Sequence, residues 1–249
     1  GVGFMSALAR TAGGTATVAD TRVEAYEVPI DALEEIFEDH FAVLVKTIRL
    51  VAERLVKEMR DMDPPPYVPP QMPYEHLIGD RPLGIVERIF LLRRARAFAA
   101  ANVNSLATLA RGMEEVRVPA GTVLWSPGAP SRESYMIVKG MARLTWDDGK
   151  RVQILGPGYV VGGSETIVGL PRWNEFKADE PLVALRGGEH GLIDLFEDDH
   201  DLALRFLSML ATFLLALQDQ KAEMGIASVG AGPYQSERAL PVSADQRAP

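Results

Sequence analysis

The chain lacks cysteine altogether, with none among its 249 residues. This absence excludes disulfide bonds, thiolate metal sites and a thiol nucleophile, and it favours a cytoplasmic localisation. Histidine is scarce as well, and the four present (His40, His76, His190 and His200) have no spacing that suits a shared metal ion or a nucleophile with its base. We therefore predict a protein that is not an enzyme and that needs no metal or cofactor.

Positive charge is in the minority, with 26 lysine and arginine residues against 34 aspartate and glutamate residues and a net charge of −8. Nucleic-acid binding depends on neutralising phosphates with basic side chains, so we predict no nucleic-acid partner. The basic cluster of Arg93, Arg94 and Arg96 is interpreted as the solvated face of a helix. The most apolar stretch, residues 206–217, is too short to span a bilayer, so we expect no membrane partner for this fragment.

Glycine and proline, by contrast, occur at close and regular intervals in residues 118–128, 135–140 and 155–158. They interrupt short β-type runs, which is typical of a compact antiparallel β-roll with tight turns. This pattern resembles the cyclic nucleotide-binding domain, the sensor module of catabolite-activator-type regulators, kinase regulatory subunits and some ion channels. The resemblance covers residues 87–225, and it implies a mainly β fold, a double-stranded β-helix or jelly roll, with flanking helices.

The same module is expected twice, in tandem. Residues 33–39 (LEEIFED) match residues 192–198 (LIDLFED) at an offset of 159 residues, and the same offset superposes Gly3 on Gly162, Ala52 on Ala211 and Leu55 on Leu214. We therefore expect residues 33–55 and 192–214 to be helical and superposable, with an extended segment over residues 15–28. The chain then begins inside its first copy, so that what precedes it, including a catalytic or membrane domain, stays open.

The expected organisation has four parts. Residues 1–60 form the C-terminal part of a truncated first copy, and residues 61–86 form a proline-rich linker in which helix is excluded. Residues 87–225 form a complete second copy. Residues 226–249 form a disordered tail, since they are polar and without periodicity.

The resemblance implies a short phosphate-binding cassette between two strands. In the family a Gly-Glu pair begins a short helix and a Pro-Arg-Ser/Thr-Ala run ends the loop. Backbone N–H groups cradle the cyclic phosphate, the arginine binds it with a planar fork of donors, and the glutamate accepts from the ribose hydroxyl. The matching stretch here is residues 161–174, in which Gly162, Gly169, Pro171 and Arg172 fit the pattern.

Other positions in this cassette depart from the pattern. Gly163 stands in place of the glutamate, and Trp173 and Asn174 replace the small residues, so that Trp173 either fills the pocket or stacks on a base. Glu165 is two residues too far along the helix to replace the carboxylate. The candidate site comprises Gly162, Gly163, Ser164, Glu165, Arg172, Trp173 and Asn174. Its possible ligand is cAMP or cGMP, with Arg172 as anchor; the alternative is a surface arginine paired with Glu175.

The first copy has neither a carboxylate nor a guanidinium at the corresponding positions, and Arg10 is the only cation nearby. Acidic clusters at residues 38–40 and 197–201 are interpreted as helix starts and not as metal sites, because carboxylates there cap N–H groups. The apolar residues of the last helix cover more than one side. That helix therefore needs a partner, either the helices of the first copy or the same helix of a second chain in a homodimer.

Two classes of function remain open. The first is a non-enzymatic regulatory or sensor module that binds a cyclic nucleotide or another small anion through Arg172. The second is a ligand-free structural or dimerisation module. The chain can also be the regulatory part of a larger enzyme or membrane protein.

Overall fold

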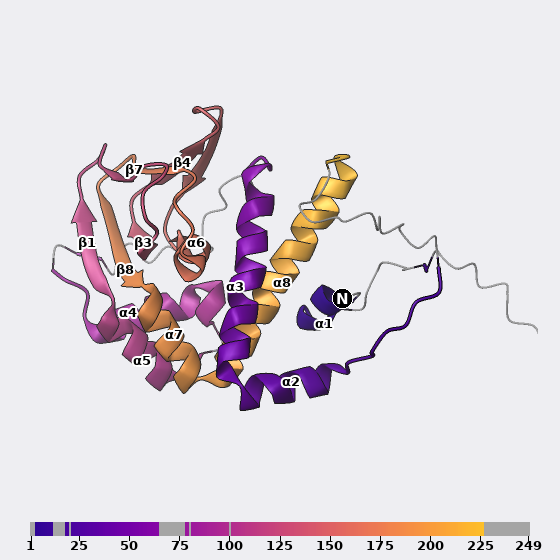
Figure 1. The fold of residues 1–249 in the computed structure, drawn as a ribbon. Helices are drawn as coiled ribbons and strands as arrows, with labels where there is room; N and C mark the ends of the chain where they lie inside the picture. Colours follow the sequence, from indigo (N-terminus) through magenta and orange to yellow (C-terminus); the bar gives the residue numbers. More distant parts are fainter. Residues whose placement is uncertain are drawn as a thin grey trace, which may run out of the picture.

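The computed structural model describes residues 3–11, 18–19, 21–64, 78–79, 81–99 and 101–226 (Figure 1). The strands are β1 (Glu114–Val118), β2 (Val123–Trp125), β3 (Glu133–Lys139), β4 (Ala142–Trp146), β5 (Arg151–Leu155), β6 (Val160–Val161), β7 (Glu175–Ala178) and β8 (Leu182–Gly188). The helices are α1 (Phe4–Leu8), α2 (Ile30–Asp39), α3 (Phe41–Arg60), α4 (Ile85–Arg94), the 3₁₀ turn η2 (Arg96–Phe98), α5 (Val103–Gly112), α6 (Gly163–Val168), α7 (Glu189–Asp198) and α8 (His200–Glu223). Residues 227–249 of the predicted tail and residues 65–77 and 80 of the predicted linker lie outside the described residues.

The predicted antiparallel β-roll is confirmed. Its two four-stranded sheets have the orders β1-β8-β3-β6 and β2-β7-β4-β5, and all strand pairs are antiparallel. The turn between β3 and β4 requires glycine, because Gly140 has a φ of 86° and an added Cβ would collide with the Pro181 carbonyl oxygen. The glycine punctuation of the sequence thus marks real turns of the roll.

The prediction of a mainly β chain is wrong, since the described residues are helical more often than extended. The β-roll is small, and helices before, within and after it bury a separate and larger apolar core. The extended segment predicted over residues 15–28 forms no strand at its described positions 18–19 and 21–28, and Tyr26 is fully exposed. A strand gains its hydrogen bonds from neighbours in a sheet, and this segment lies beside neither sheet.

The two predicted helical stretches are both helical, and each is interrupted once. His40 separates α2 from α3 with φ −134° and ψ 74°, and Asp199 separates α7 from α8 with φ −138° and ψ 81°. Asp199 caps α8 by accepting from the Leu202 amide at 3.1 Å, whereas α3 has no side-chain cap. Of the two acidic clusters interpreted as helix starts, only the second therefore provides a cap. No group of acidic residues and histidines in the described part of the chain is arranged to hold a metal ion.

The N-terminal helices lie against the rest of the molecule. The long helices α3 and α8 run side by side (Figure 1), α3 also packs on α6, and α1 packs on α8. Leu44 and Ile48 of α3 and Leu207 and Leu214 of α8 belong to one core cluster with Ile167 of α6. A second β-roll is not evident in the described residues. The second side of α8 is therefore covered by helices of the same chain.

Among the described residues, α8 is the one helix that is long and apolar enough to cross a membrane. The apolar run at 206–217, which is too short by itself to span a bilayer, is thus part of the 24-residue helix α8. Packing accounts for part of this apolar character, because α8 has neighbours on several sides and Phe206 is buried against Phe196, with ring centroids 5.0 Å apart. Core helices of folded domains have the same composition.

Candidate phosphate-binding cassette

The cassette helix α6 begins directly after β6 and is bounded by two glycines. Gly162 at its N-terminus has φ 77° and Gly169 at its C-terminus has φ 73°, both in the left-handed region that favours glycine. The Gly162 carbonyl accepts from the Thr166 amide at 3.1 Å and from the Thr166 hydroxyl at 2.7 Å. An added Cβ at Gly162 would collide with the Arg172 guanidinium and approach Trp125 to 3.0 Å. The close approach of these groups is thus possible only with glycine.

Arg172 points into the molecule and is only 3% exposed. Its Nη1 donates to the Gly162 carbonyl at 3.1 Å, and its Nη2 donates to the Glu133 carbonyl and, at 3.3 Å, to the Thr166 hydroxyl. The Arg172 backbone is held by the loop before β3, since its amide donates to the Ala129 carbonyl at 2.9 Å. The guanidinium therefore ties the start of α6 to the start of β3.

Aromatic rings fill the roll interior beside this guanidinium. The Arg172 Cζ lies 4.0 Å from the Trp125 ring centroid, which is a cation–π contact. Tyr135 and Phe176 pack against the same indole at centroid distances of 5.8 and 4.6 Å, and all three rings are buried. We call Trp125, Tyr135 and Phe176 the aromatic cluster. The indole N–H of Trp125 donates to Asn174 Oδ1 at 2.9 Å. Trp125 therefore contacts the residues on both sides of Trp173, namely Arg172 and Asn174.

The electrostatics of Arg172 are unusual for a buried guanidinium. Within the described residues it has no carboxylate oxygen within 4.0 Å, and its pKa is lowered by burial, an effect that the negative charge of Glu165 and Glu133 offsets in part. Glu165 is buried on α6 but forms no ion pair with it. Burial likewise raises the pKa of the Tyr135 hydroxyl, which donates to Glu133 Oε2 at 3.0 Å. The positive charge is stabilised by carbonyl dipoles, a hydroxyl and an aromatic face.

The predicted site residues divide between two sides of the loop. Arg172 and Asn174 point inward, but Trp173 points outward, and its ring packs edge-on against Trp146 at 5.1 Å and lies 5.9 Å from the Arg60 Cζ of α3. The Trp173 ring therefore lies against Trp146 and Arg60, while Arg172 packs on Trp125. The expectation that Trp173 fills the pocket or stacks on a base stays a prediction. The alternative of a surface arginine paired with Glu175 is wrong, since Arg172 is buried.

The remaining predicted residues, Gly163 and Ser164, lie on the first turn of α6 and form no hydrogen bond with Arg172 in the described structure. Gly163 has room for a side chain, because an added Cβ would meet only Val160 at an ordinary 3.6 Å. Sequence reasoning missed Trp125, Glu133 and Thr166. Thr166 follows Gly162 by one helical turn and was recognisable from that spacing, whereas no spacing links Trp125 or Glu133 to the cassette.

Helix α3 covers the far end of the cassette helix. Arg49 of α3 donates from Nε to the Ile167 carbonyl at 3.3 Å and from Nη2 to Glu189 Oε1 at 2.6 Å. The Ile167 side chain beneath is 2% exposed and belongs to the helical core. The cassette is thus held from inside by Arg172 and from outside by the N-terminal segment.

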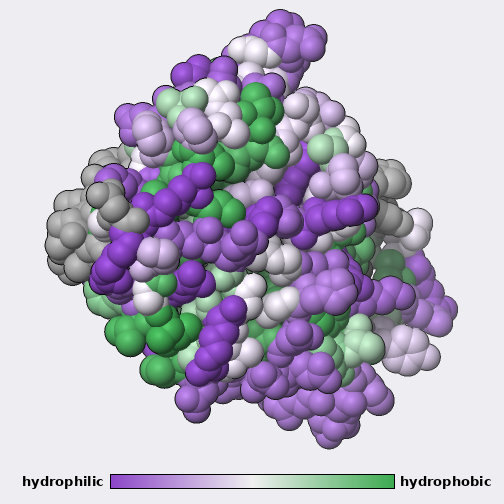
Figure 2. Space-filling model, turned by 90° about the vertical axis from the view of Figure 1, so that its left-hand side faces the viewer, coloured by the Kyte–Doolittle hydropathy of each residue, from purple (hydrophilic) through white to green (hydrophobic). Residues whose placement is uncertain are grey.

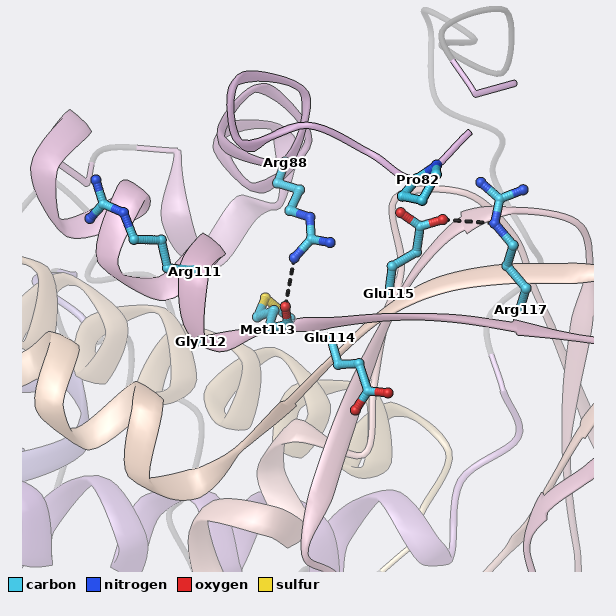
Figure 3. A pocket seen from close by; sticks show the side chains of 8 residues that line it. All are labelled: Pro82, Arg88, Arg111, Gly112, Met113, Glu114, Glu115 and Arg117. Atoms are coloured by element: carbon cyan, nitrogen blue, oxygen red, sulfur yellow. Dashed lines mark hydrogen bonds and ion pairs between the residues drawn. The ribbon is translucent and has the colours of Figure 1, made fainter. Parts of the chain in front are cut away.

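A separate surface pocket of about 590 Å³ lies where α4 and α5 meet β1 (Figure 3). Two of its arginines are already engaged, since Arg88 donates to the Met113 carbonyl and Arg117 pairs with Glu115, each at 2.7 Å. The side of the molecule that is on the left in Figure 1 mixes hydrophilic and apolar groups (Figure 2). This pocket shares no residue with the cassette.

Comparison with known proteins now identifies the β-roll. A family model described as cyclic nucleotide-binding domain matches residues 115–199, which span β1 to the break before α8. Residues 115–199 are a cyclic nucleotide-binding domain. It is a single domain of the regulatory and sensor type, and it includes the whole cassette. A search among curated proteins finds no match for this chain.

Several solved structures resemble the chain. A cyclic nucleotide-binding-like protein from Brucella abortus is 26% identical over 44% of this chain and 97% of its own, with a TM-score of 0.40. The sensor domain of the transcriptional regulator DNR from Pseudomonas aeruginosa is 18% identical over 56% and 95%, with a TM-score of 0.47. A cAMP-binding acyltransferase from Mycobacterium smegmatis is 22% identical over 44% and 35%, with a TM-score of 0.37. The absence of catalytic activity from this chain stays a prediction.

Proposed function

We propose that this cyclic nucleotide-binding domain is a regulatory module whose cassette is occupied by its own side chains and which acts without a free cyclic nucleotide. The observation that carries the proposal is the state of Arg172, whose Nη donors bond to the carbonyls of Gly162 and Glu133 and to the Thr166 hydroxyl. A cyclic phosphate needs the same donors. It would have to displace these acceptors and the indole of Trp125, which stacks on the guanidinium.

The second group that a cyclic nucleotide needs is absent. Gly163 stands where the family has the glutamate that accepts from the ribose hydroxyl. A buried hydroxyl without its acceptor costs about 1–3 kcal/mol, or roughly one to two orders of magnitude in affinity. The loss of this acceptor and the paired state of Arg172 act in the same direction.

One observation favours a second candidate function, the binding of cAMP or cGMP through Arg172. The guanidinium is buried without a carboxylate within 4.0 Å in the described structure, so its charge has no anionic counterpart in direct contact. A phosphate would supply one. In this candidate Trp125 leaves the guanidinium when the ligand enters, and the module is a sensor.

Titration with cAMP and with cGMP up to millimolar concentration separates the two candidates. A ligand that binds the folded state must raise the thermal midpoint. Because the first candidate function involves no nucleotide binding, we expect no rise for the wild type. The variant Trp125→Leu with Gly163→Glu opens space beside Arg172 and restores the carboxylate, so we expect it to gain binding, with Gly163→Glu alone as control. The second candidate would replace the first if cAMP or cGMP raised the thermal midpoint of the wild type. In that case Arg172→Ala should weaken the affinity for the nucleotide more than tenfold, and Arg186→Ala should not.

We also infer that residues 3–60 are the C-terminal part of another module of the same type, the first copy of a tandem pair. The offset of 159 residues pairs α2 with α7 and the break at His40 with that at Asp199, where φ and ψ differ by less than about 10°. It also pairs Gly3, with φ 76°, with Gly162, with φ 77°, each at the start of a short helix. The linker at 61–86 and the tail at 226–249 remain part of this proposal, as does a cytoplasmic setting.

A further inference from the structure

The end of the α3–α8 interface contains a fully buried ion pair. Lys221 Nζ of α8 lies 2.7 Å from Glu58 Oε2 of α3, and both side chains are completely inaccessible. Asp61, at the half-exposed edge, lies 3.3 Å from the same ammonium group. The second carboxylate oxygen of Glu58 has no hydrogen-bond partner among the described residues. The pair, which we call the Glu58–Lys221 pair, is thus buried with one polar atom unsatisfied.

A pair of this kind is a poor source of stability. Removing two charges from water costs several kcal/mol for each, and well-packed apolar residues of similar volume are often as stable or more so. Removing one partner alone is strongly unfavourable, because the other charge stays buried. Such a pair is better suited to disfavour the packing of α8 against a wrong helix. Any other helix that faces Lys221 must also place a carboxylate beside it, or the ammonium group stays buried without a counter-charge.

The repeat defines what the wrong pairing would be. At the offset of 159 residues, Glu58 corresponds to Leu217 of α8, and Lys221 corresponds to Met62 after α3. If the α8 helix of a second chain took the place of α3, Lys221 would face Leu217 and remain buried without a counter-charge. If α3 paired with a second α3, Glu58 would face Met62 and remain equally unpaired. Only α3 with α8 satisfies both charges.

We propose that the Glu58–Lys221 pair selects the pairing of α3 with α8 within one chain, so that the chain is a monomer in which α3 occupies the place of a second copy's α8. This rests on the tandem relation proposed above. It assigns to α8 a partner in the same chain and excludes the symmetric homodimer as the resting state. The rest of the interface is compatible with either pairing, because it consists of apolar residues such as Leu44, Ile48, Leu207 and Leu214.

The deciding experiment replaces the pair without leaving a charge. We expect Glu58→Leu with Lys221→Met to fold with a Tm equal to or above that of the wild type. Light scattering from micromolar to millimolar concentration should report a monomer for the wild type and a concentration-dependent dimer for this double variant. A dimeric wild type would overturn the proposal. So would a double variant that stays monomeric throughout or fails to fold, since the pair would then serve stability and not choice of partner.

Charge reversal gives an independent test. Lys221→Glu places a carboxylate beside Glu58 and Asp61, and we expect its Tm to fall by about 10 °C. Adding Glu58→Lys to this variant should recover more than half of the loss; no recovery would sink the proposal. The matched control reverses the exposed pair of Glu53 and Lys57 on the same helix, 2.7 Å apart, and should change neither Tm nor mass. Cyclic-nucleotide binding by the wild type would refute the proposed function and leave these outcomes unchanged.

Discussion

The short helix α1 before the β-roll and the cassette helix α6 within it begin with the same backbone conformation but have different side-chain contacts. Helix α1 begins at Gly3 and helix α6 begins at Gly162, and both glycines have a left-handed backbone. In the cassette, Arg172 lies ten residues after Gly162 and donates to its carbonyl. The first start is followed by Arg10, which lies in the left-handed region with φ 53° and forms an exposed pair with Glu34 at 2.6 Å. In the described residues, the N-terminal segment thus has the backbone geometry of a cassette-like helix start, and no contact there corresponds to those of Arg172.

The two helix starts differ in what determines them. Helix breaks and helix starts are determined by a whole core, since α1 packs on α8 and α3 packs on α6. Ligand chemistry depends on one or two side chains such as Arg172. We expect the two regions to respond alike to changes in the core and differently to changes at the cassette.

The largest effect is expected at the equivalent core phenylalanines Phe37 and Phe196, which are 1% and 0% exposed. Each should lose about 3–5 kcal/mol of unfolding free energy on replacement by alanine, because a large buried ring leaves a cavity. Phe196→Ala should be at the upper end, since that ring also packs on Phe206. Urea denaturation measures both. If Phe37→Ala cost less than about 1 kcal/mol, the N-terminal helices would not belong to the same core.

A middle effect is expected at the two equivalent glycines, and here the regions should differ. Gly162→Ala combines a left-handed backbone with a collision against the Arg172 guanidinium, so we expect a loss of about 2–4 kcal/mol. At Gly3 an added Cβ meets nothing within 4 Å, so Gly3→Ala should cost only the backbone term of about 1–2 kcal/mol. Thermal unfolding of the two variants measures the difference. Equal losses would mean that the Arg172 contact carries no weight.

The smallest effect concerns alkaline pH and only the β-roll. The pKa of Tyr135 is raised by burial, so the folded state disfavours ionisation of its hydroxyl. The corresponding stability is fully present below the unfolded pKa of about 10 and is lost as pH rises above it towards the folded pKa. Tyr135→Phe should therefore flatten the fall of the unfolding free energy above pH 10 by a few tenths of a kcal/mol. A fall as steep as that of the wild type would show that Tyr135 does not carry it.

The cassette illustrates where prediction from sequence ended. Gly162 and Arg172 were recognisable because a left-handed turn and a fork of donors each demand one residue type at a set place in the loop. The inward direction of Asn174 and the outward direction of Trp173 were not, because they depend on how the loop meets β2 and β4. Trp125 and Glu133 come from strands distant in sequence, and only sheet pairing brings them to Arg172.

By itself, the sequence determined the β-roll, its turns and the two interrupted helical stretches at a constant offset, because glycine, proline and apolar periodicity act within a few residues of the chain. Only the tertiary structure decided that α3 covers α6, that Glu58 meets Lys221 across 163 residues of chain, and that Arg172 bonds to its own fold. These contacts join segments far apart in sequence. Their choice depends on which surfaces a whole core leaves open, and no local pattern records that.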